Sequence, residues 1–73
     1  MTNIKLLHYY MEVNKRDIHD IALLLDLPLE TTELLLKGKQ EFTAQEMDLV
    51  STYLNIPLSV RTIIFFATEE ELA

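Results

Sequence analysis

Apolar residues recur along this chain at the three- and four-residue spacing of helices, and no segment shows the sustained two-residue alternation of a half-buried strand. One glycine and two prolines leave little room for hairpin turns. The pattern therefore predicts an all-α protein. Its five short helices are expected over residues 4–13, about 17–25, about 28–37, 43 to the residues before Pro57, and from 59 onward.

Polar residues mark where these helices begin and end. Side chains that accept from the free N–H groups of a helix start precede three of the five: Thr2 or Asn3, Asp17, and Thr43. Glu46 stands three residues after Thr43, which is the capping-box pattern. Gly38 is placed to end the third helix in the left-handed conformation, and the segment 26–28 forms the tight turn before that helix.

The same spacing predicts the core and also leaves some leucines outside it. Ile4, Leu7 and Met11 share one face of the first helix, Met47, Val50 and Leu54 share one face of the fourth, and the last helix, from Ser59, carries Val60, Ile63, Ile64 and Phe66. The triplets Leu23–Leu25 and Leu34–Leu36 each span roughly 200° of a helix wheel. A helix cannot bury every side, so at least two or three of these leucines are expected to point outward.

Composition narrows the class of protein. A length of 73 residues predicts one domain, 1–73, with a small core. The absence of cysteine excludes disulfides and thiolate metal sites, and we expect no metal and no cofactor. The apolar runs are too short to span a membrane, and we expect no signal peptide. No catalytic triad, phosphate loop or paired catalytic carboxylates can be assembled, so we expect neither an enzyme nor a small-molecule ligand.

The charge distribution is unusual for a protein that reads DNA. The net charge is −6, and residues 17–36 hold five acidic residues and no Lys or Arg. A protein gains most of its affinity for DNA by neutralising phosphates with basic residues. The basic residues lie outside this stretch: Lys5, Lys15, Arg16, Lys37, Lys39 and Arg61.

The order of elements resembles the lambda-repressor-like helix-turn-helix family, with the helix-turn-helix at the second and third helices. Ala22 matches the small residue of the second helix, Gly38 follows sixteen residues later, and Leu25, Leu27 and Leu35 fall on core positions. The segment GKQEFTAQEMDLVSTYLNIPLSVRTIIFFA resembles small phage proteins of the Cro-like type. The resemblance implies a cytoplasmic regulator of the lysis–lysogeny switch in a bacterial host. Some members bind operators, and modulator-of-repression proteins act together with the phage repressor.

The chain departs from this family where members contact DNA. Positions that usually offer Gln, Ser, Arg or Asn to phosphates and bases are occupied here by Ile18, Pro28, Leu29, Glu30, Glu33 and Leu34. Exposed apolar groups rimmed by charge are typical of protein interfaces. We therefore expect these six residues to bind a protein, namely the helix-turn-helix domain of a phage repressor, with weak DNA binding or DNA binding only together with that partner.

Two alternatives stay open at this point. The first is a Cro-like DNA-binding repressor that acts as a dimer on operator DNA, with Lys37, Lys39 and Arg61 supplying positive charge; Lys37 and Lys39 are then candidates for contacts with the DNA backbone. The second is a homo-oligomeric structural protein that buries its leucine face against itself. The acidic charge of the second and third helices favours an antagonist or modulator that binds the repressor over a Cro-like DNA-binding repressor. Self-association without a partner would favour the homo-oligomeric structural protein.

Four other features have simpler structural explanations. His8 is expected at the edge of the core, and His19 in solvent. Asp17 and Asp20 resemble a metal pair, but a cap and first-turn charge explain them better. The run Glu69–Glu71 is expected to be a frayed, solvated end of the chain.

Overall fold

A computed structural model describes residues 1–68 and residue 70 of the chain. Within residues 1–68 the chain forms five α-helices and no strand: α1 (Ile4–Val13), α2 (Ile18–Leu25), α3 (Leu29–Leu36), α4 (Ala44–Tyr53) and α5 (Leu58–Phe65). The all-α class with five helices is thereby confirmed, and assignment to the helix-turn-helix family stays a prediction. Glu69 and Glu71 of the predicted solvated end lie outside the described residues.

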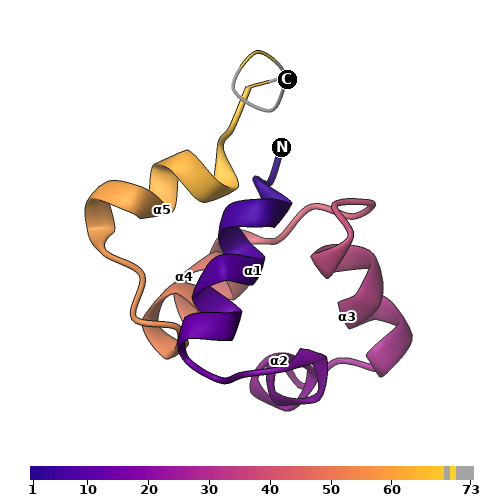
Figure 1. Ribbon diagram of the computed structural model, residues 1–73. Helices are drawn as coiled ribbons and strands as arrows, with labels where there is room; N and C mark the ends of the chain where they lie inside the picture. The colour runs from indigo at the N-terminus through magenta and orange to yellow at the C-terminus, as the bar shows by residue number, and fades with distance from the viewer. Residues whose placement is uncertain (69, 71–73) are drawn as a thin grey trace.

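Helix α1 lies between α5 and α3 in the view of Figure 1. It packs against α3 and α5, while α2 packs against α3 and α4. The backbone of residues 1–3 runs beside the end of α5, where the Asn3 N–H donates to the Ile64 carbonyl at 2.6 Å and the Ala67 N–H donates to the Met1 carbonyl at 2.9 Å. The radius of gyration, 11.2 Å, equals the value of about 11 Å expected for a folded chain of this length.

One apolar core joins all five helices. Its buried side chains are Leu7, Met11, Ile21, Leu35, Leu36, Phe42, Val50, Leu54, Ile56, Ile64 and Phe65. The predicted inward residues Leu7, Met11, Val50 and Leu54 are among them, and Phe42 meets Phe65 edge to face with ring centroids 5.3 Å apart. Leu25 and Leu27 are half-buried against this core, whereas Leu23 and Leu34 are exposed. The expectation that two or three leucines point outward is therefore confirmed.

The predicted start of the last helix needs correction by one residue. Helix α5 begins at Leu58, directly after Pro57, and not at Ser59. Phe66 is its C-cap and is 63% exposed, while its neighbour Phe65 is buried. Ile64 and Phe65 face the core, whereas Ile63 and Phe66 are exposed.

Helix ends in this chain depend on left-handed backbone. Within residues 1–68 four residues have positive φ: Lys15, Asp26, Gly38 and Asn55. Each closes the helix before it with the two hydrogen bonds of a Schellman motif. At α3 the Lys39 N–H donates to the Leu34 carbonyl at 2.9 Å and the Gly38 N–H donates to the Leu35 carbonyl at 3.2 Å. The predicted end of the third helix at Gly38 is confirmed, with φ at 74°.

The same turn joins α2 to α3 and α4 to α5. A left-handed Asp26 or Asn55 is followed by an apolar residue, a proline N-cap and an exposed leucine. The N–H of the apolar residue reaches back five positions, from Leu27 to the Ala22 carbonyl and from Ile56 to the Ser51 carbonyl. Proline fits the N-cap because it fixes φ near −65° and has no N–H to leave unpaired. Only three residues thus separate α2 from α3, and four separate α4 from α5.

Asn14 ties the ends of two helices together. Its amide Nδ2 donates to the Tyr10 carbonyl of α1 and to the Leu54 carbonyl beyond α4, both at 2.7 Å. Its Oδ1 accepts from Asn55 Nδ2 at 3.0 Å. The Tyr10 carbonyl also accepts from the Asn14 backbone N–H, so the side chain adds a second hydrogen bond there and gives the Leu54 carbonyl, beyond the end of α4, a partner.

Substitutions at two of the left-handed positions should change the free energy of unfolding in opposite directions. A Cβ added at Gly38 would stand 3.0 Å from Ile4 Cγ1, in a conformation that side chains disfavour, so Gly38→Ala should lower the free energy of unfolding by about 1 kcal/mol or more. Lys15→Gly should raise it by about 0.5 kcal/mol, because removing the side-chain strain outweighs the added freedom of the unfolded chain. Urea unfolding measures both, and a Lys15→Gly variant clearly less stable than the parent protein would contradict this account.

Candidate functional site

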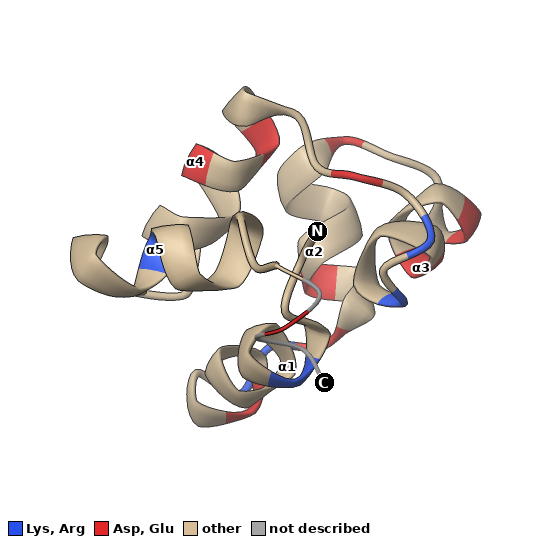
Figure 2. Cartoon of the chain, turned by 90° about the horizontal axis from the view of Figure 1, so that it is seen from above, with Lys and Arg blue, Asp and Glu red and all other residues tan. Residues whose placement is uncertain are grey.

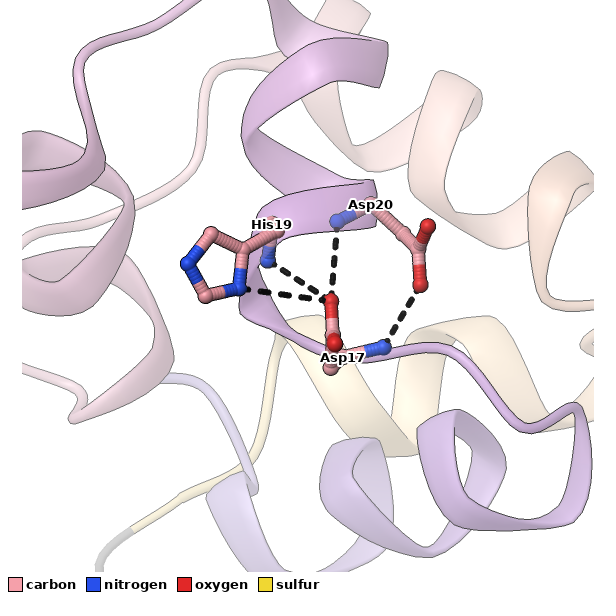
Figure 3. Close-up of polar contacts among 3 residues, drawn as sticks. All are labelled: Asp17, His19 and Asp20. Carbon is pink, nitrogen blue, oxygen red and sulfur yellow. Dashed lines mark hydrogen bonds and ion pairs between the residues drawn. The ribbon is translucent and has the colours of Figure 1, made fainter.

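The start of α2 is held by a capping box made of two carboxylates (Figure 3). Asp17 Oδ1 accepts from the backbone N–H groups of His19 at 2.9 Å and Asp20 at 3.1 Å. In return, Asp20 Oδ2 accepts from the Asp17 N–H at 2.9 Å. The predicted cap is confirmed, and it includes Asp20 as a reciprocal partner. Among the described residues no group of three potential ligands could hold a metal ion.

These contacts lower the pKa of Asp17 below its ordinary value. The largest cause is the hydrogen bond from the Asp20 backbone N–H to the charged carboxylate. Desolvation is the second-largest cause and opposes this lowering, while the backbone N–H and the charge of His19 add to it. The His19 ring is exposed, as expected, with Nδ1 3.7 Å from Asp17 Oδ1. Both acidic residues at the start of α2 therefore stabilise the helix itself.

The outward side of α3 combines leucine with carboxylate. Leu29 is 45% exposed and Leu34 is 42% exposed. Glu30 and Glu33 are exposed between them on the helix wheel. Figure 2 shows the acidic segments on α3 and the basic segments that follow its end. Five predicted partner residues, Pro28, Leu29, Glu30, Glu33 and Leu34, thus lie exposed at the start and along the outer side of one helix.

The sixth predicted residue, Ile18, is placed differently. It is the first residue of α2, is half-buried and packs against the core. Only part of its side chain is available to a partner. The exposed part of its side chain lines a hollow between α1, α2 and α3.

Leu23 was not among the residues predicted to bind a partner, but the structure adds it to the same surface. It is 83% exposed, more than any other large apolar residue of the described chain. A shallow groove of about 360 Å³ runs between α2 and the start of α3 and is lined by His19, Ala22, Leu23, Asp26, Leu27 and Leu29. The outward position of Leu23 could have been found from its place on the α2 wheel, opposite the buried Ile21. Leu23 extends the apolar surface of α3 onto α2.

A larger hollow lies at the other end of α2. It has a volume of about 440 Å³ and is bounded by α1, the start of α2 and the end of α3. We call it the α1–α3 hollow. Met11, Ile18 and Leu36 supply its apolar lining, and its charged lining comes from Glu12, Arg16, Asp17, Glu33 and Lys37. His8 also lines it, and the His8 Nε2–H donates to the Leu36 carbonyl at 3.0 Å. His8 thus lies exposed at the end of α3 and not simply at the core edge.

The basic residues proposed for DNA contacts are partly engaged within the chain. Lys37 Nζ lies 3.9 Å from Glu33 Oε1 on the same helix surface. Arg61 Nε donates to the Ile56 carbonyl at 3.0 Å, and its Nη1 lies 3.6 Å from Asp48 Oδ1. Lys39 is exposed beyond the end of α3. These contacts reduce the positive charge that the chain could offer to phosphates.

Comparison of the chain with protein-family models, with curated proteins and with solved structures found no match. None of the helices in the described part of the chain combines the length and the apolar character that a bilayer span requires.

The capping box predicts how stability depends on pH. Because the pKa of Asp17 is lowered by folding, its charge stabilises the native state above the unfolded pKa of about 3.9, and this contribution is lost as pH falls through the native pKa. Asp17→Asn keeps a side-chain acceptor but removes the charge. The parent protein should therefore exceed this variant in stability near pH 6, and the difference should shrink below pH 4.

Urea unfolding at a series of pH values between about 2.5 and 7 measures that difference. Glu12→Gln serves as the matched control, because Glu12 is an exposed carboxylate near the end of α1 that caps no helix. A stability difference between parent and Asp17→Asn that stays constant to pH 2.5 would contradict the role assigned to the Asp17 charge.

Proposed function

We propose that this chain is a phage-type transcriptional regulator that antagonises or modulates a repressor in the cytoplasm of a bacterial host. It binds the repressor's DNA-binding domain through the outward side of α2 and α3. The observation that carries the proposal is the exposure of Leu23, Leu29 and Leu34 among carboxylates, in a stretch without any Lys or Arg. The resemblance to small phage helix-turn-helix proteins supplies the class of partner.

The physical basis is complementarity with a surface built to bind DNA. A DNA-reading face presents Arg, Lys and polar groups. Glu30 and Glu33 attract such groups and speed the encounter of the two proteins. Burying an exposed leucine contributes up to about 1.5–3 kcal/mol before the costs of association. A partner that occupies the reading face in this way competes with operator DNA for the repressor.

The same surface disfavours direct DNA binding by this chain. Carboxylates at the phosphate backbone oppose the counterion release that drives association with DNA. Glu33 also lies beside Lys37, one of the basic residues that could contact phosphates. The chain is therefore expected to bind DNA weakly, or only in the company of its partner.

Reversing the charge of α3 tests the proposal. Glu30→Lys combined with Glu33→Lys places like charges against the basic partner and should weaken binding to a repressor DNA-binding domain at least about a hundredfold. Folding should survive, since exposed substitutions change stability by about 0.5 kcal/mol each. Calorimetric titration at two salt concentrations measures the affinity, and circular dichroism checks the fold.

Matched variants distinguish an effect of the α3 surface from an effect of net charge alone. Glu41→Lys combined with Asp48→Lys makes the same change in net charge away from α2 and α3, and it should leave most of the affinity intact. Because Glu41 pairs with the N-terminal ammonium and Asp48 with Arg61, circular dichroism also checks that this variant folds. Leu23→Ala should weaken binding with little change in salt dependence, whereas Leu58→Ala, on the equally exposed start of α5, should have no effect. If the doubly reversed protein is folded and binds as the parent does, the proposed face is wrong, and the exposed Leu58 and Phe66 of α5 become the next surface to test.

A further inference from the structure

We infer that the α1–α3 hollow receives an arginine side chain of the basic partner, an inference that rests on the proposed function and names the anchor of that interaction. Three features of the hollow carry it: an apolar lining, a Glu12 carboxylate without a partner among the described residues, and an Arg16 side chain that lies over the Tyr53 ring.

The lining matches the long stem of a basic side chain. Met11 and Leu36 are buried beneath the hollow, and Ile18 is half-buried at its side. Arg and Lys place their methylene groups along such apolar surface while the charged end stays near water. The open volume of about 440 Å³ leaves room for one such side chain.

The rim supplies negative charge. Glu12 projects from α1 and Glu33 from α3, so carboxylates border the hollow from two helices. In the described part of the chain the Glu12 carboxylate takes part in no hydrogen bond or ion pair. Glu33 is held only by the exposed pair with Lys37 at 3.9 Å, and such surface pairs are weak and easily exchanged. Both carboxylates are therefore available to an incoming cation.

The other charged groups at the rim are already engaged. The Arg16 guanidinium lies over the Tyr53 ring, 4.9 Å from its centroid, and this cation–π contact holds it at the Tyr53 side of the hollow. Asp17 accepts the capping hydrogen bonds of α2, and His8 donates to the Leu36 carbonyl. Three carboxylates, those of Glu12, Asp17 and Glu33, and two permanent cations, Arg16 and Lys37, border the hollow, so a cation is favoured over an anion. Arginine fits better than lysine because its planar guanidinium is weakly hydrated and can bond two carboxylate oxygens at once.

The test uses a small probe and needs no repressor. N-acetyl-arginine amide is titrated into the ¹⁵N-labelled chain at about 0.15 M salt, where long-range attraction to a negative protein is screened beyond roughly 8 Å. Saturable chemical-shift changes are expected at Glu12, Ile18 and Glu33. N-acetyl-citrulline amide, which has the same shape without the charge, should bind more weakly.

Two carboxylate variants make the test specific to the hollow. Glu12→Gln should weaken binding of the arginine probe about two- to fivefold, the effect of one exposed ion pair. Glu41→Gln, which removes a carboxylate elsewhere on the surface, should leave it unchanged. Shifts spread evenly over all carboxylates, equal binding of the citrulline probe, or preferential binding of N-acetyl-leucine amide at the same residues would each overturn the inference.

The outcome can be separated from that of the proposed function. If the repressor domain binds and depends on Glu30 and Glu33 but the arginine probe does not enter the hollow, only this inference fails. If the probe enters the hollow while charge reversal at Glu30 and Glu33 leaves repressor binding intact, the inference stands as a property of the hollow and the proposed face fails.

Discussion

The left-handed backbone at Asp26 sets how α2 meets α3, and the exposed surface of both helices follows from it. With φ at 54° and ψ at 46°, Asp26 ends α2 and brings the Leu27 N–H to the Ala22 carbonyl, so that α3 begins after only Pro28. Helices of eight residues joined this closely must pack at a fixed angle against one core. Their consecutive leucines cannot all reach that core. Leu23 of α2 and Leu34 of α3 consequently lie exposed, and Leu29 is exposed at the start of α3.

The carboxylates of this region divide into two groups with different tasks. Asp17 and Asp20 cap α2 and satisfy backbone N–H groups that would otherwise lack partners. Glu30 and Glu33 point outward from α3, and the nearest basic partner of Glu33 is Lys37 at the end of the same helix. The first group explains why α2 is a stable helix. The second leaves negative charge beside exposed leucines, which is the combination that favours a basic protein partner over DNA.

Local patterns predicted the helices well because their signals are short in range. The spacing of Leu7 and Met11, the cap at Asp17 and the stop at Gly38 each depend on a few neighbouring residues. The left-handed Lys15 was not predicted, because lysine carries no preference for that conformation and only packing of the helix ends imposes it.

Features that join distant segments could not be read from local patterns. The hollow brings His8 and Glu12 of α1 beside Glu33 of α3, and no spacing within either helix indicates that proximity. Ile18 shows the same limit, since only the packing of α2 on the core reveals that it is half-buried. The start of α5 was placed one residue late, at Ser59 in place of Leu58, because local patterns define helix ends only to within about one or two residues.

Competition with operator DNA tests the central claim most directly. A fluorescently labelled operator is bound to a repressor DNA-binding domain, and its anisotropy is followed while this chain is added; a second titration adds the chain to the operator alone. The account predicts that anisotropy falls to the value of free DNA in the first titration and stays unchanged in the second at about 0.15 M salt. Undiminished anisotropy in the first titration, or sequence-specific binding below micromolar concentration in the second, would contradict it.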